Sequence, residues 1–180
     1  MYRYVPEFFE AIAEAAARQR RNLGPFEVSS LARSFWVAEA AGRAFPLPEI
    51  YDIFAEAAHR RLADCNAREL STLAFTFSKV GLLGGPLLDG LLNESGPRLD
   101  QFKVQELVAL TVAMRDAGDR ASREVGFLQV LGAELYNRQA ELTEDERRSV
   151  ARSYVAMRLP QPVDAGAYSD TVDDAWGGGE

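Results

Sequence analysis

The segment Cys65–Gly81 reads CNARELSTLAFTFSKVG, and the same seventeen-residue pattern recurs along the chain. The other copies are FEVSSLARSFWVAEAAG at Phe26–Gly42, FKVQELVALTVAMRDAG at Phe102–Gly118 and a divergent LTEDERRSVARSYVAMR at Leu142–Arg158. Their starts lie 39, 37 and 40 residues apart. A period near 40 without strand signals is typical of helical repeats, which bury their apolar faces only by stacking on neighbours. The pattern predicts an all-α solenoid.

Each copy carries apolar residues at helical spacing. In the clearest copy this stripe consists of Leu70, Leu73, Ala74, Phe77 and Val80, which lie on one face of an amphipathic helix. The first three copies end in glycine, the residue that most easily adopts the left-handed conformation that stops a helix. The divergent copy has arginine there and a more polar stripe, as expected of a terminal repeat.

A second helix is predicted in each repeat, at about Pro48–Leu62, Pro86–Leu92 and Ser122–Gln139. The middle one is expected to be short or irregular because glycines surround it. The N-terminal segment Glu7–Arg18 matches Glu49–Arg60 nearly position for position. We therefore expect about eight helices in antiparallel pairs, in an array over residues 5–158 that starts in the middle of a repeat.

Residues 159–180 differ in composition from the array. The stretch from Pro160 to Glu180 contains five acids and no Lys or Arg, so the net charge of −7 becomes −2 without it. We expect this tail to be extended or disordered, with Tyr168 and Trp176 as its aromatic contacts to a protein partner. Trp36 lies one step off the apolar stripe, and we expect it in a groove or interface.

The composition provides few residues that could form a catalytic or metal site. Cys65 and His59 are the only cysteine and histidine, which excludes an internal disulfide and a His/Cys metal cage. His59 is interpreted as a residue at a helix C-terminus, and Cys65 as a small buried apolar residue. We expect no enzyme, no cofactor and no membrane span, and no targeting segment is visible.

Arginines recur at one place in the repeat. Arg61, Arg98 and Arg138 each stand four residues before a copy begins, and the same turn of the repeat also carries Arg18, Arg20, Arg21 and Arg60. Equivalent positions in a stacked array line up along one edge. This arginine column could contact successive phosphates of RNA or an acidic protein. The alternative is a set of solvated residues that end helices, where positive charge is favoured.

The copies CNARELSTLAFTFSKVG and FKVQELVALTVAMRDAG resemble the degenerate 37–40-residue repeats of the octotricopeptide and heptatricopeptide families, which occur in organellar RNA-metabolism proteins and ahead of RAP domains. The resemblance covers about Phe26–Arg158. It implies an α-solenoid in a mitochondrion or plastid that binds RNA or serves as a scaffold. The chain departs from the family in its few repeats, its negative charge and its lack of a RAP-type segment.

These observations predict a non-enzymatic adaptor or structural subunit of a large organellar assembly, with a ribonucleoprotein such as the mitochondrial ribosome favoured. Its partners would be proteins of that complex. The alternative is a direct RNA-binding protein that uses the arginine column.

Overall fold

The computed structural model describes residues 6–42 and 48–163, which contain nine α-helices and no strand. The four repeated copies form α2 (Pro25–Ala40), α4 (Ala67–Lys79), α6 (Val104–Asp116) and α9 (Glu144–Ala156). The second helices are α1 (Pro6–Gln19), α3 (Pro48–His59), α5 (Gly85–Ser95) and α8 (Val125–Asn137). A short α7 (Asp119–Ser122) and 3-10 turns at Leu62–Asp64, Gly96–Gln101 and Gln139–Glu141 lie in the connections.

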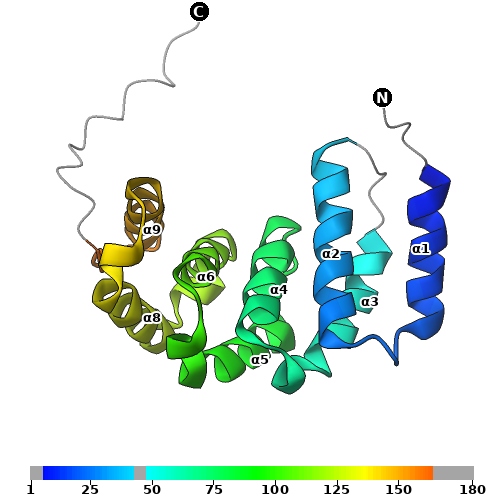
Figure 1. Ribbon diagram of the computed structural model, residues 1–180, viewed down its shortest axis with the longest axis horizontal. Helices are drawn as coiled ribbons and strands as arrows, with labels where there is room; N and C mark the ends of the chain where they lie inside the picture. The colour runs from blue at the N-terminus through cyan, green and yellow to red at the C-terminus, as the bar shows by residue number, and fades with distance from the viewer. Residues whose placement is uncertain (1–5, 43–47, 164–180) are drawn as a thin grey trace, which may run out of the picture.

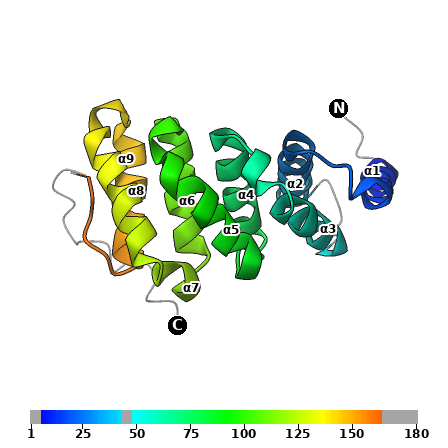
Figure 2. The same cartoon turned by 90° about the horizontal axis from the view of Figure 1, so that it is seen from below.

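The helices form a curved two-layer array (Figure 1). Successive copies α2, α4, α6 and α9 pack on one another in chain order along the inner side of the arc, and these are the most extensive contacts between helices. The second helices lie on the outer side, with α3 against α2 and α5 against α3. Figure 2 shows the same succession from below. The prediction of an all-α helical-repeat fold is confirmed.

Local sequence signals mark where the helices begin and end. Asn66 accepts a hydrogen bond from the backbone of Glu69, whose carboxylate accepts one from the Asn66 backbone in return. Such reciprocal caps satisfy backbone donors that an isolated helix start leaves unpaired. Glycines at three helix C-termini adopt positive φ of 63°, 73° and 72°, and Arg158 adopts the same conformation at φ 60° in the divergent copy.

Helix α5 is longer than expected. It spans 11 residues despite its glycines, and one of these glycines lies at a close contact with the preceding repeat. A Cβ on Gly90 would lie 2.5 Å from Cδ1 of Leu62, in the 3-10 turn that follows α3. Close approach of α5 to that turn thus depends on the missing side chain. The short α7 is also additional to the eight helices that the sequence predicts.

The first copy differs in register from the others. Helix α2 begins one turn early, because Gly24 is its N-cap and Pro25 suits the first helical position. Leu23 is therefore buried at 8% exposure, as Cys65 and Phe102 are before their helices. Phe26, which the sequence alignment places with Cys65, is 68% exposed. The expected equivalence of Phe26 and Cys65 is wrong.

The boundary of the tail also needs correction. The array does not stop at residue 158, because Leu159 packs against the core and Val163 belongs to it at 4% exposure. Pro162 approaches Gly132 of α8 so closely that a Cβ on this glycine would lie 3.1 Å from the proline Cβ. Residues 159–163 therefore continue the folded array without forming a helix.

Candidate binding groove on the inner face

A groove runs across the inner helices α2, α4 and α6. It consists of two adjoining cavities of about 320 and 330 Å³ that share Arg33, Arg68 and Thr72. We call these two cavities the inner groove. The other lining residues are Phe26, Ser29 and Ser30 from α2, Asn66, Glu69, Ser71, Phe75 and Thr76 from the region of α4, and Gln105, Glu106 and Ala109 from α6.

Aromatic side chains give the inner groove an apolar side. The Trp36 ring stands edge-on to Phe75 with their centroids 5.5 Å apart, a geometry that aromatic pairs favour. Both residues are partly buried, whereas Phe26, which lines the other cavity of the groove, is 68% exposed. The structure thus places Trp36 on the inner face, next to a residue that lines the groove.

An ion pair links two inner helices next to these rings. The ammonium of Lys79 lies 2.6 Å from Oδ2 of Asp116 and 5.0 Å from the Phe75 centroid. Burial alone would raise the pKa of Asp116, but hydrogen bonds from Lys79 and Arg115 outweigh it and hold the pKa below its usual value. Asp116 is therefore ionised at neutral pH, and Lys79 has its countercharge within the fold.

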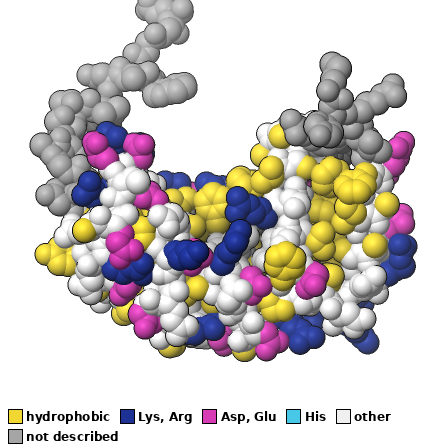
Figure 3. All heavy atoms as spheres, in the orientation of Figure 1, with side chains coloured by type: hydrophobic (Ala, Val, Ile, Leu, Met, Phe, Trp, Pro, Cys, Tyr) yellow, Lys and Arg dark blue, Asp and Glu magenta, His cyan; other side chains and the backbone are white. Residues whose placement is uncertain are grey.

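Two other cations at the inner groove have no such countercharge. Arg33 and Arg68 are exposed, and neither forms an ion pair or side-chain hydrogen bond within the described residues. The carboxylates that also line the groove, Glu69 and Glu106, each accept a 2.8 Å hydrogen bond from the backbone N–H of the residue that caps their helix. Figure 3 shows basic side chains beside hydrophobic ones near the middle of the array.

Arg33 and Arg68 lie outside the arginine column that the sequence predicts. A signal for them exists, because both stand off the apolar stripe of their copies and must lie on the side of an inner helix that faces away from the core. Their lack of a partner could not be seen, since it depends on which carboxylates the neighbouring helices bring near.

The arginine column contributes to the fold itself. Arg98 donates to the Cys65 carbonyl at 3.2 Å, and Arg138 donates to the Phe102 carbonyl at 2.6 Å. Arg60 makes a corresponding 2.9 Å bond to the Arg20 carbonyl. Each bond ties the end of an outer helix to the turn of the preceding repeat.

Most members of the column also have a carboxylate partner. Arg18, Arg60, Arg61, Arg98 and Arg138 all form ion pairs with acids within four residues in the chain. Arg20 and Arg21 are exposed and form no ion pair within the described residues. The contact role of the column stays a prediction, and five of its seven members already neutralise charge in the fold.

Removing the Arg138 side chain is expected to destabilise the protein. Arg138→Ala leaves the Phe102 carbonyl and Glu134 without their charged donor, and the arginine side chain is only 23% exposed. We expect a loss of about 1–2 kcal/mol in the free energy of unfolding, measured by urea titration. Arg21→Ala is the matched control and should change it by no more than about 0.5 kcal/mol. Equal effects of the two variants would show that Arg138 does not link the repeats.

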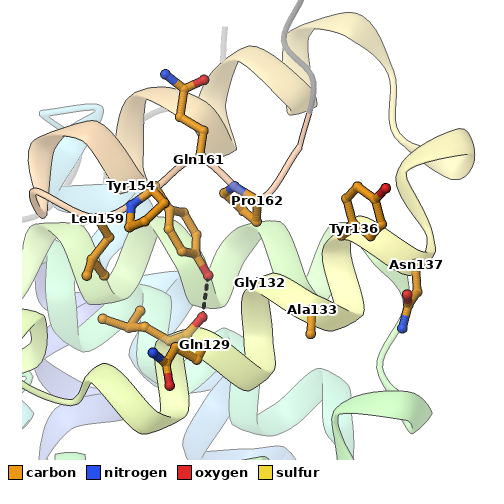
Figure 4. Close-up of a pocket in the computed structure, with 11 residues that line it drawn as sticks. Gln129, Gly132, Ala133, Tyr136, Asn137, Tyr154, Leu159, Gln161 and Pro162 are labelled. Atoms are coloured by element: carbon orange, nitrogen blue, oxygen red, sulfur yellow. Dashed lines mark hydrogen bonds between the residues drawn. The ribbon is translucent and has the colours of Figure 1, made fainter.

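A second, more apolar pocket lies at the C-terminal end of the array. It has a volume of about 340 Å³ and is lined by residues of α8, by Tyr154 and by residues 159–162. In Figure 4, Tyr154 points from α9 towards α8, where its hydroxyl donates a 2.7 Å hydrogen bond to the Leu128 carbonyl. Burial raises the pKa of Tyr154, so it stays a neutral donor. This pocket is a gap beneath the segment that closes the array.

The two residues considered for catalysis are poorly placed for it. Cys65 is 2% exposed, and burial, aided by Glu69 and Asp64, raises the pKa of its thiol to about 12. His59 is the exposed last residue of α3. Within the described residues, no three His, Cys, Asp or Glu side chains gather in a way that could hold a metal ion. Tyr168 and Trp176 lie outside the described residues.

Over the same described ranges, no helix combines the length and apolar character that a bilayer crossing requires. No protein-family model matches the chain, and a search of curated proteins finds no significant match.

Proposed function

We propose that this chain is a non-enzymatic helical-repeat adaptor that holds a segment of another protein along its inner groove, as part of a larger organellar assembly. The observation that carries the proposal is the pairing of unpartnered cations, Arg33 and Arg68, with the exposed ring of Phe26 in one groove. The organellar setting rests on the resemblance of the repeats to the octotricopeptide and heptatricopeptide families.

The array supports binding by shape and position. Its inner helices pack on one another, and an ion pair between Lys79 and Asp116 ties α4 to α6. The groove is therefore preformed, and a ligand meets little ordering cost. An aromatic side chain exposed in a concave surface provides apolar area that a partner can cover. The guanidinium groups are suited to carboxylates, with which they form forked hydrogen bonds.

Direct RNA binding is less well supported. A binder that follows the phosphate backbone needs several free cations in a row. In the arginine column, Arg98 and Arg138 donate to carbonyls and carboxylates of the fold instead. The body of the chain also carries a net negative charge.

Site-specific photo-crosslinking in cells that express the full chain tests the proposal. A benzophenone amino acid at Thr72, inside the groove, should give a discrete adduct with one partner protein. The matched control carries the same group at Asp52, an exposed residue of the outer helix α3, and should not give this adduct. Charge reversal by Arg33→Glu with Arg68→Glu should abolish the Thr72 adduct.

Three outcomes would overturn the proposal. They are the absence of any protein adduct from Thr72, the same adducts from Asp52, and adducts that nuclease removes. The last outcome would indicate RNA in the groove, and its affinity should then fall steeply with salt.

A further inference from the structure

The inner groove specifies the chemistry of what it binds. Its free cations, Arg33 and Arg68, lie where the two cavities meet, between Phe26 in one cavity and Phe75 in the other. The carboxylates that also line it, Glu69 and Glu106, are held by backbone N–H groups at their own helix starts. A complementary peptide would bring at least two carboxylates and an aromatic side chain close together in sequence, and no lysine or arginine that the two guanidinium groups would repel.

Residues 164–180 of the chain have this composition. They contain all five acids of the tail, no Lys or Arg, and the aromatic residues Tyr168 and Trp176. Asp173 and Asp174 stand adjacent, two residues before Trp176. Carboxylates and an aromatic ring thus occur within four residues, which is the combination that the groove matches.

The segment is long enough to reach the groove. It follows Val163, which is buried at the α9 end of the array. Because packed helices lie about 10 Å apart, Arg68 on α4 is two steps and about 20 Å from α9, and Arg33 on α2 is three steps and about 30 Å from it, in the succession that Figure 1 shows. Ten extended residues, the distance in sequence from Val163 to Asp173, span up to about 33 Å. A tether of this length also gives an effective concentration on the order of millimolar, so individually weak contacts suffice.

We propose that residues 164–180 dock into the inner groove of their own chain, with Asp173 and Asp174 at Arg33 and Arg68 and Trp176 at the aromatic side. This inference rests on the proposed function, because it takes the groove to be the binding surface. It also specifies that function further, since an external partner must displace the segment. The partner is then itself an acidic peptide segment with an aromatic residue.

The experiment uses the full chain labelled with 5-fluorotryptophan. The chain has two tryptophans, so it gives two fluorine signals, which the Trp36→Phe and Trp176→Phe variants assign. The shift of the Trp176 signal between H₂O and D₂O measures its exposure to solvent. At low salt we expect a shift several-fold smaller than in the urea-unfolded chain, and unchanged on dilution because docking occurs within one molecule.

Two variants with equal charge changes then locate the docking site. Arg33→Ala with Arg68→Ala should restore the full solvent shift of Trp176. Arg20→Ala with Arg21→Ala, which removes two exposed cations elsewhere in the array, should leave it small. About 1 M NaCl, where the Debye length is about 3 Å, should act like the groove variant.

A fully exposed Trp176 signal in the unmodified chain would overturn the proposal. A protected Trp176 signal that neither the groove variant nor salt changes would also overturn it, because the segment would then lie elsewhere. Protection that disappears on dilution would overturn it as well, because docking would then occur between molecules. No partner protein is present in this experiment. If docking of the segment fails here, the Thr72 crosslink still decides the proposed function. If the Thr72 crosslink fails, the fluorine experiment still decides whether the segment docks.

Discussion

Replacement of Phe77 with alanine is expected to lower the free energy of unfolding by about 3–5 kcal/mol, the usual cost of removing a fully buried aromatic side chain. Phe77 is 0% exposed and lies in α4, which packs against both α2 and α6. Because each repeat is stabilised mainly by its neighbours, a cavity here also weakens the coupling between the two halves of the array. Urea unfolding followed by circular dichroism should show a lower midpoint and a broader transition.

Phe26→Ala is the matched control for this substitution. It removes the same side chain from the adjacent inner helix, where the ring is 68% exposed. Its effect on stability should stay within about 0.5 kcal/mol, as for other exposed positions, while partner binding at the groove weakens. Equal losses of stability in the two variants would contradict the burial that the fold assigns to Phe77.

Alkylation of Cys65 by iodoacetamide should be slower by a factor on the order of a thousand in the folded than in the unfolded chain at pH 8. The thiolate is the reactive form, and the environment raises the pKa of the thiol from 9.0 to about 12, which lowers the thiolate fraction by about that factor. Steric protection at 2% exposure acts in the same direction. Mass spectrometry of the labelled chain over time measures the rate.

The raised pKa of the Cys65 thiol also makes the free energy of unfolding depend on pH. Because the folded chain keeps its thiol proton longer than the unfolded chain, this contribution to stability is complete below pH 9 and is lost as the pH rises from about 9 towards 12. Labelling in urea supplies the control rate of an ordinary thiol. Equally rapid labelling of the folded chain would show that Cys65 is neither buried nor protonated as described.

Much of the fold could be predicted from the periodicity. The apolar stripe placed Leu70 and Leu107 at equivalent positions, and both are 0% exposed. The glycines that end three copies adopt the left-handed conformation. These features depend on spacing within one helix and on the allowed dihedral angles of one residue, so they are encoded locally.

The candidate site was harder to predict. Spacing predicts that Arg98 and Arg138 occupy equivalent positions, but it does not reveal that they donate to backbone carbonyls 33 and 36 residues away. Arg33 and Arg68 occur in two of the same copies, and no spacing in the sequence distinguishes them from the other arginines. The register of α2 was also missed, because the Gly24–Pro25 helix start outweighs the resemblance of Phe26 to Phe102.

The sequence by itself determined the number of repeats, their helical character and the packed side of α4 and α6, because these follow from short-range periodicity. Only the tertiary structure decided which cations are neutralised and which remain available. The physical reason is that an ion pair or a hydrogen bond to a carbonyl depends on distances of a few ångströms between different helices. Stacking sets those distances, and no spacing within a single repeat reveals them.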